Sequence, residues 1–217
     1  MRASRPHARV RRAARHGVAM ALAVLCLAPA ASAQGERVIV AFGDSLTAGY
    51  GVAPEEAYPA LLAARLRHEG YRYHVVNAGV SGDTTAGGLR RVDWALKARP
   101  EIVLLELGAN DALRGLDLGQ VRANLDGIVT RFEAAGARVL LLGMRLPPNY
   151  GARYAGEFAR IYDEIARRRK LALMPFFLDG VGAVAALNQP DGIHPTAEGY
   201  RIIVARLWPH LQPLLKH

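Results

Sequence analysis

Four short segments of this sequence carry side chains suited to nucleophilic chemistry. They span residues 43–47, 77–84, 108–111 and 191–195. A nucleophilic serine needs a base within hydrogen-bond reach, a carboxylate that orients the base, and donors for an oxyanion. The first segment, Gly-Asp-Ser-Leu-Thr, supplies Ser45 as the candidate nucleophile. The last supplies His194 as the candidate base and Asp191 as its partner, because a carboxylate so close in a turn can fold back onto the imidazole.

Each of these residues also has a purely structural interpretation. A serine directly after a strand is a common N-cap, so Ser45 could cap the helix that follows. Asp191 next to Gly192 is typical of an Asx turn or a helix cap. His194 could be a solvent-exposed residue at the start of a helix. The structural and catalytic interpretations are compatible with each other.

The two middle segments supply candidate donors for an oxyanion. Glycine permits close approach of the backbone and a positive φ, and a side-chain amide is a neutral donor. The candidates are the backbone N–H groups of Ser45 and Gly82 and the side-chain amide of Asn110. Gly79 competes with Gly82 for this role, and Asn110 could instead form a turn with Asp111.

Short apolar runs alternate with helical segments along the chain. The predicted strands span residues 37–42, 73–77, 102–107, 138–143 and 171–175. The predicted helices span residues 55–69, 85–99, 118–135, 154–170 and 196–215. Nearly continuous apolar character is typical of parallel strands buried on both faces. We therefore expect an α/β fold, a three-layer αβα sandwich around a flavodoxin-like parallel sheet of about five strands, in the order 2-1-3-4-5.

Residues 1–33 have the three parts of a secretory signal, namely six arginines, an apolar stretch over residues 18–27 and the site Ala31-Ser32-Ala33. The apolar stretch is shorter than the ~20 residues of a transmembrane helix, so we expect no stable membrane span. Loss of the six arginines lowers the formal charge from +9 to +3, which removes most of the support for a nucleic-acid partner. We expect an exported protein, periplasmic or secreted, with one domain over residues 34–217.

In this order, the four segments resemble the conserved blocks of the GDSL or SGNH hydrolases, which contain Ser, Gly, Asn and His. The resemblance runs from about residue 37 to the C-terminus. It implies that Ser45, Asp191 and His194 form a catalytic triad. It also implies an oxyanion hole made by Ser45, Gly82 and Asn110, and it favours Gly82 over the competing glycine.

A closer resemblance, to the bacterial periplasmic subgroup of thioesterase I, protease I, lysophospholipase L1 and arylesterases, is carried by residues 106–115, 145–151 and 191–195. It implies an exported serine esterase for acyl and aryl esters, with thioesterase and lysophospholipase activity and an acyl-enzyme intermediate. The alternatives are a carbohydrate or peptidoglycan O-acetylesterase, or a non-catalytic binding module on the same fold. The Gly-x-Ser-x-Gly elbow of the common α/β-hydrolases is absent from the sequence.

Apolar residues near the four segments could line a groove for a small-molecule or lipid ester. The expected substrate-binding residues are Leu113, Leu116, Leu146, Pro147 and Tyr150. Other apolar residues nearby are Met144, Phe176 and Phe177, and we expect core packing for Met144 and for at least one of the two phenylalanines. The sequence lacks the ligand spacings of common metal sites and the lysine of a phosphate-binding loop, so we expect no cofactor. The sequence does not determine the oligomeric state, and we favour a monomer.

Overall fold

The computed structural model describes residues 36–217 together with Met1. The prediction of a signal peptide over residues 1–33 therefore lies outside the described residues, apart from Met1. The described residues form a five-stranded parallel sheet with the strand order β2-β1-β3-β4-β5. The strands are β1 (Arg37–Gly43), β2 (Tyr73–Gly79), β3 (Ile102–Glu106), β4 (Arg138–Leu142) and β5 (Ala172–Met174). The predicted α/β fold and strand order are confirmed.

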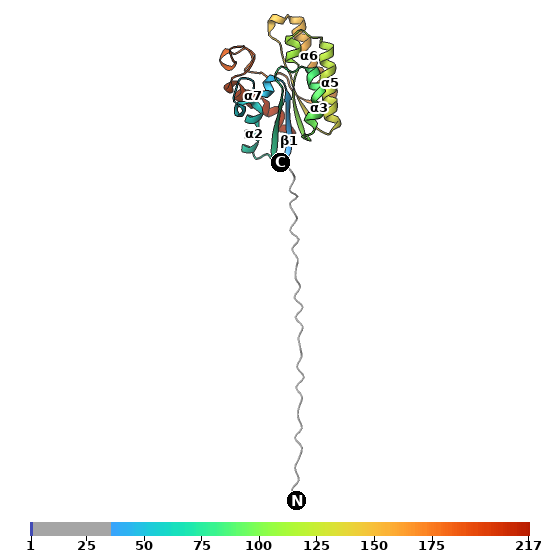
Figure 1. Cartoon of the computed structure of the whole chain (residues 1–217), viewed down its shortest axis with the longest axis vertical. Helices are drawn as coiled ribbons and strands as arrows, with labels where there is room; N and C mark the ends of the chain where they lie inside the picture. The colour runs from blue at the N-terminus through green and yellow to red at the C-terminus, as the bar shows by residue number, and fades with distance from the viewer. Residues whose placement is uncertain (2–35) are drawn as a thin grey trace. The chain divides into compact units, whose positions relative to one another are not determined.

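Helices cover both faces of this sheet. On one side lie α2 (Tyr58–His68) and α7 (Ala197–Leu211), and on the other lie α3 (Thr85–Leu96), α5 (Leu118–Ala134) and α6 (Ala152–Arg169), as Figure 1 shows. Residues 39–42 of β1 and 102–105 of β3 have no solvent-exposed surface, because helices pack on both faces of these inner strands. Continuous apolar runs of this kind are what a parallel sheet with two covered faces requires.

The structure differs from the predicted elements in a few places. The helix expected over residues 55–69 is divided into a 3-10 turn at Pro54–Glu56 and the helix α2, which begins at Tyr58 with Pro59 in its first turn. Proline fits the first turn because the N–H that it lacks would have no partner there. Two short helices, α1 (Ser45–Ala48) and α4 (Ala109–Leu113), occupy positions where the sequence indicates turns.

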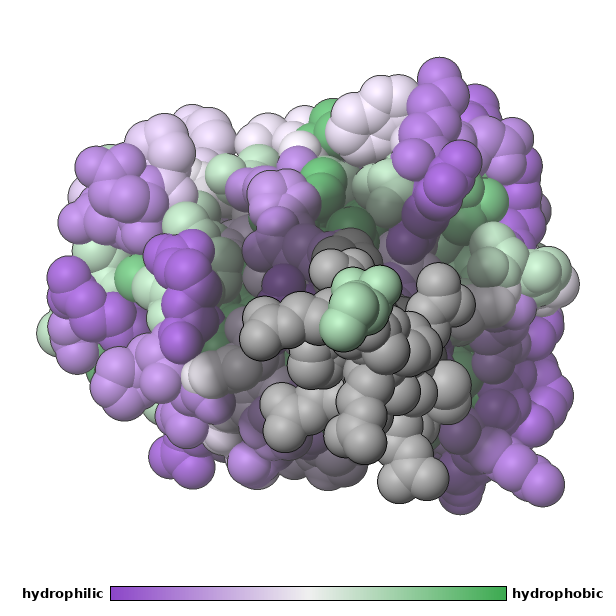
Figure 2. Space-filling model, turned by 90° about the horizontal axis from the view of Figure 1, so that it is seen from below, coloured by the Kyte–Doolittle hydropathy of each residue, from purple (hydrophilic) through white to green (hydrophobic). Residues whose placement is uncertain are grey.

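The two ends of the sheet differ in character. The carboxyl ends of the strands carry all four chemically suited segments, as expected for a parallel sheet. At the opposite end, where the strands begin, hydrophilic residues predominate in the coloured part of the surface (Figure 2). The candidate site is therefore found at the carboxyl end.

Candidate active site

Ser45 is the first residue of the short helix α1, directly after β1. Asp44, and not Ser45, is the N-cap of this helix, since its Oδ1 accepts a hydrogen bond of 3.0 Å from the backbone N–H of Leu46. The capping role considered for Ser45 is therefore wrong, and its hydroxyl is available for other contacts. Gly43 is required by close packing, because a methyl group at this position would lie 2.0 Å from Thr47 Oγ1.

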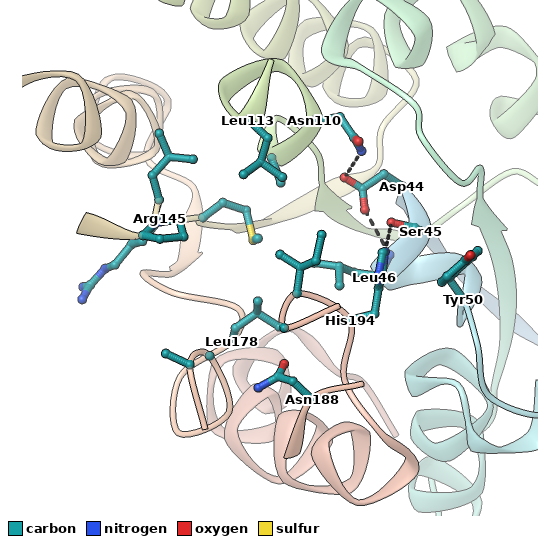
Figure 3. Close-up of a pocket in the computed structure, with 18 of the residues that line it drawn as sticks. Asp44, Ser45, Leu46, Tyr50, Asn110, Leu113, Arg145, Leu178, Asn188 and His194 are labelled. Carbon is teal, nitrogen blue, oxygen red and sulfur yellow. Dashed lines mark hydrogen bonds between the residues drawn. The ribbon is translucent and has the colours of Figure 1, made fainter. Parts of the chain in front are cut away.

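His194 and Asp191 lie in the loop before α7 and form a continuous chain of hydrogen bonds with Ser45. The Nε2 atom of His194 lies 2.9 Å from the Oγ of Ser45 (Figure 3). Its Nδ1 lies 2.7 Å from the Oδ2 of Asp191. The other carboxylate oxygen of Asp191 accepts from the backbone N–H groups of Ile193 and His194, both at 3.0 Å. The turn-forming contacts and the contact with the imidazole thus occur together in Asp191.

The charge of Asp191 is stabilised by these contacts. Partial burial raises the pKa of this carboxyl, but the hydrogen bonds from the backbone and ring of His194 and from the backbone of Ile193 outweigh that effect and lower the pKa to about 2. Asp191 is therefore ionised at neutral pH. The ring of Tyr50 lies against the ring of His194, with 4.6 Å between the centroids, and limits the imidazole's movement on that side.

The amides of two neighbouring residues hold this loop in place. Gln189 donates from Nε2 to the backbone oxygens of Tyr50 at 2.7 Å and Pro195 at 2.9 Å. Asn188 is buried and donates to the backbone oxygens of Val181 and Val184. Sequence reasoning missed both amides, because polar side chains in a loop usually indicate only solvent exposure.

The candidate oxyanion donors come from three separate segments, after β1, β2 and β3, and line one cavity. Gly82 lies in the loop after β2 with φ +79°, and Asn110 lies in α4, which begins after Gly108 with φ +117°. Within the described part of the chain, the backbone N–H groups of Ser45 and Gly82 donate to no acceptor. Gly79, the competing glycine, does not line the cavity; a methyl group there would lie 2.2 Å from the backbone nitrogen of Ala48.

Arg91 connects the loop of Gly82 to the sheet, and sequence reasoning missed it. Its guanidinium donates to Asp83 Oδ2 at 2.6 Å and to the backbone oxygens of Ala78 and Gly43, each at 2.8 Å. It also lies over the ring of Phe42, 3.9 Å from the centroid. One arginine therefore binds the ends of β1 and β2 and the residue after Gly82.

Asp44 and Glu106 form a buried carboxyl pair behind Ser45. Glu106 Oε2 accepts from the hydroxyl of Thr47 at 2.9 Å and from the backbone N–H of Asp44 at 3.3 Å. Glu106 Oε1 is buried and has no hydrogen-bond partner among the described residues. Asp44 Oδ2 accepts from Nδ2 of Asn110 at 3.0 Å, so the pair reaches the candidate oxyanion site.

Burial controls the protonation of this pair. Desolvation, followed by the negative charge of Asp44, raises the pKa of Glu106 well above its ordinary value. Desolvation raises the pKa of Asp44 to about 6, in opposition to the hydrogen bonds that it accepts. Of the two carboxyl groups, Glu106 therefore holds a proton more strongly and Asp44 is the one that carries the charge, since two buried charges side by side would repel each other.

An apolar cavity of about 580 Å³ extends from Ser45 and His194 along the carboxyl edge of the sheet. Among its lining residues are Leu113, Leu146 and Pro147, which the sequence predicts as substrate-binding residues, and also Met144, Phe176 and Leu178. Figure 3 shows Leu113 and Leu178 on opposite sides of this space, with Arg145 at the end remote from Ser45. Met144 is buried and lines the cavity as well, whereas Phe177 is a core residue that packs against Tyr58.

Leu116 and Tyr150 do not line this cavity, and their prediction as substrate-binding residues is corrected here. Leu116 follows Gly115, whose φ of +68° turns the chain away, and its side chain is exposed at the edge of a separate polar hollow. The hydroxyl of Tyr150 lies 3.4 Å from the backbone oxygen of Leu113. Tyr150 thus supports the cavity wall from behind.

A family model described as the GDSL-like lipase/acylhydrolase family matches residues 41–202. This range includes all five candidate catalytic and oxyanion residues. The chain belongs to this family. It is a GDSL, or SGNH, hydrolase, and its fold is the one seen in solved members of the family.

Relatives with established names are esterases and related hydrolases. The chain is 47% identical over 195 residues to "Esterase TesA" of Pseudomonas aeruginosa. The matched region covers 89% of this chain and 96% of the relative. It is 41% identical over 180 residues to "Thioesterase 1/protease 1/lysophospholipase L1" of Escherichia coli, covering 82% of this chain and 85% of the relative.

A solved structure extends this similarity to three dimensions. The esterase EstA of Pseudoalteromonas sp., inhibited by monoethylphosphonate, superposes with a TM-score of 0.78 at 34% identity and covers 82% of this chain and 97% of EstA. Together with the named relatives, it shows that this SGNH hydrolase is an esterase. No helix in the described part of the chain is long and apolar enough to cross a membrane.

Proposed function

We propose that this SGNH esterase is exported and hydrolyses acyl and aryl carboxylic esters through Ser45, His194 and Asp191, with thioesterase and lysophospholipase activity. The observation that carries the proposal is the chain of hydrogen bonds from Asp191 through His194 to Ser45, at 2.7 and 2.9 Å, at one end of an apolar cavity. This arrangement supplies a nucleophile, a base and an orienting carboxylate.

In the first half of the reaction, Ser45 Oγ attacks the carbonyl carbon of the ester while His194 Nε2 takes the hydroxyl proton. The carbonyl oxygen becomes an oxyanion, and the N–H groups of Ser45, Gly82 and Asn110 are the proposed donors to it. The bond from carbon to the leaving oxygen or sulfur then breaks. His194 returns its proton to the leaving group, and the acyl group remains on Ser45.

In the second half, water attacks the acyl-enzyme and His194 takes a proton from the water. Collapse of the second tetrahedral intermediate releases the carboxylic acid and returns the proton to Ser45 Oγ. Asp191 accepts from Nδ1–H of His194 throughout, which leaves Nε2 as the acceptor facing Ser45 and stabilises the imidazolium when it forms. No cofactor is needed for these steps.

The apolar lining supports an acyl chain or an aromatic ring as the bound group more than a small polar acetylated sugar. The names of the relatives, which include thioesterase and lysophospholipase, support both oxyester and thioester hydrolysis. The proposed signal over residues 1–33 would bring the enzyme to the cell envelope. Lysophospholipids and other acyl esters are therefore the proposed substrates there, since coenzyme A is a cytosolic carrier.

The experiment combines a Ser45→Ala variant with mass labelling by a fluorophosphonate. We expect the variant to fold normally, lose hydrolysis of p-nitrophenyl esters and take no label, whereas the wild type takes one label on Ser45. Normal hydrolysis by the variant, or a label on another residue, would contradict the proposal. A comparison of acetyl with octanoyl p-nitrophenyl esters tests the substrate class, and faster turnover of the acetyl ester would favour an O-acetylesterase.

A further inference from the structure

Arg114 has an exposed side chain that contacts both segments proposed to stabilise the oxyanion. Its Nη2 donates to the backbone oxygen of Gly82 at 3.0 Å and lies 3.5 Å from Oδ1 of Asn110. Gly82 belongs to the loop after β2, whereas Asn110 belongs to α4, after β3. Within the described residues, no carboxylate forms an ion pair with Arg114. Its side-chain hydrogen bonds are made with these two segments.

The side-chain amide of Asn110 lies between partners of opposite charge. Its oxygen faces the guanidinium of Arg114, and its Nδ2 donates to the carboxylate of Asp44 at 3.0 Å. A flipped amide would bring its NH₂ group against the guanidinium and its oxygen against the carboxylate, and both contacts would be repulsive. The NH₂ group carries two hydrogens, of which Asp44 takes one. The second hydrogen is thus left available for an oxygen atom in the cavity.

The contact with Gly82 restrains the other segment. Gly82 has φ +79° and the backbone freedom of glycine, so its conformation is weakly restricted by its own residue type. The hydrogen bond from Arg114 fixes its carbonyl group, while its N–H donates to no acceptor in the described part of the chain. One side chain therefore connects two donors that the backbone does not join directly.

We propose that Arg114 is a positioning residue of the esterase reaction, which aligns the N–H of Gly82 and the amide of Asn110 on a single oxyanion. The inference rests on the proposed function, because the oxyanion forms only in acyl transfer to Ser45. Such alignment matters because oxyanion stabilisation depends on donors that are in place before the charge develops.

The test uses the full-length enzyme with Arg114→Met, Arg114→Lys and the control Arg201→Met. Arg201 is also exposed, its side chain pairs with Glu198 on α7, and neither residue lines the cavity. For Arg114→Met we expect kcat for p-nitrophenyl butyrate to fall about tenfold or more, a part of the two to three orders of magnitude that loss of one donor costs. We expect KM within about twofold of the wild type and an unchanged melting temperature. Arg114→Lys should retain an intermediate kcat, and the control should match the wild type.

A second comparison separates positioning from a general effect of charge. In an Asn110→Ala background, Arg114→Met should lower kcat by a clearly smaller factor, because one of its two targets is gone. The inference would be overturned if Arg114→Met lowered kcat by the same factor in the wild-type and Asn110→Ala backgrounds. It would also be overturned if Arg201→Met lowered kcat as much as Arg114→Met does. Unchanged kcat in Arg114→Met with an inactive Ser45→Ala would overturn it and leave the proposed function intact. Activity in Ser45→Ala would instead refute the proposed function.

Discussion

Ser45 lies between two acidic regions that differ in burial. On one side, Asp191 is on a loop and its side chain is 37% exposed. On the other side, Asp44 and Glu106 lie at the ends of β1 and β3 and are almost completely buried. The pKa of Asp191 is lowered to about 2, whereas burial raises the pKa of Asp44 to about 6 and that of Glu106 well above its ordinary value.

The difference shows how environment assigns roles to chemically similar groups. A carboxylate that must stay charged beside a histidine is found where backbone N–H groups and solvent stabilise the charge. The buried pair can hold only one charge without strong repulsion, so Glu106 keeps a proton and Asp44 carries the charge. The pair holds the turn after β1 and the amide of Asn110. The carboxylate that we propose as catalytic, Asp191, can therefore be distinguished from the buried pair by its environment alone.

The largest expected effect is on the exposed side. Asp191→Asn removes the charge that orients His194 and should lower kcat about 10⁴-fold, since a wrong tautomer leaves Nε2 unable to accept the proton of Ser45. Steady-state hydrolysis of p-nitrophenyl butyrate measures this loss, with the melting temperature as the control for folding. A loss smaller than about tenfold would assign the orienting role to another carboxylate, and the contrast between the two regions would be wrong.

The next effect concerns the charged member of the buried pair. Asp44→Asn keeps a good N-cap for α1 but places an NH₂ group against Nδ2 of Asn110, so the amide of Asn110 is expected to turn away. We expect kcat to fall about 10²-fold, as for loss of one oxyanion donor, with KM little changed. If kcat stays within about twofold of the wild type, Asp44 does not position Asn110.

Glu106→Gln tests the protonated member of the pair, and we expect kcat within about threefold of the wild type because Gln mimics a neutral carboxyl group. The raised pKa means that the folded state keeps a proton that the unfolded state releases above pH 4.5. The free energy of unfolding should therefore fall as pH rises above that value, by at most about 1.4 kcal/mol per pH unit. In urea unfolding between pH 5 and 9, the free energy of unfolding should fall less with pH in the variant than in the wild type. If the two proteins show the same dependence on pH, the proton is not on Glu106.

The smallest effect is the stability contributed by Asp191. Its pKa is lowered from 3.8 to about 2, so its contribution to stability is present above pH about 4 and is lost as pH falls through 2. The melting temperature of Asp191→Asn should be slightly below that of the wild type at pH 6, and the two should converge near pH 2. Asp179→Asn, at an exposed pair with Arg206, is the control. A constant difference across this range would mean that the charge of Asp191 is not the cause.

The sheet could be predicted from the sequence because its inner strands are continuous apolar runs with helical segments between them. The short helix α4 could not be predicted, because it begins after Gly108, whose backbone has a left-handed conformation. A residue with a side chain would not fit at this position, since a methyl group there would lie 2.5 Å from the hydroxyl of Tyr162. The direction of Leu116 could not be predicted either. It depends on the turn at Gly115, and proximity in sequence does not determine which side chains face a cavity.

The residues of the candidate site could be predicted from the sequence, but the contacts that hold them in place could not. Asp191 and His194 are close in sequence, so their contact could be expected. Glu106 has a visible signal, since it is the charged residue in the apolar run 102–107, but its partners Asp44 and Thr47 are 62 and 59 positions away. The contact of Arg114 with Gly82 could not be predicted, because nothing in the sequence distinguishes Arg114 from other surface arginines. The contact depends on the loop after β2 lying beside α4.

The hydrogen bond between His194 and Ser45 joins residues 149 positions apart, and the one from Tyr200 to the backbone oxygen of Leu46 joins residues 154 positions apart. Contacts of such separation form late in folding, because closing a long segment of chain costs entropy before the contact repays it. The chain of hydrogen bonds from Asp191 to Ser45 is therefore complete only after α7 has packed beside α1, at the carboxyl end of β1. During refolding, the return of esterase activity should mark the final step, later than the return of helical structure.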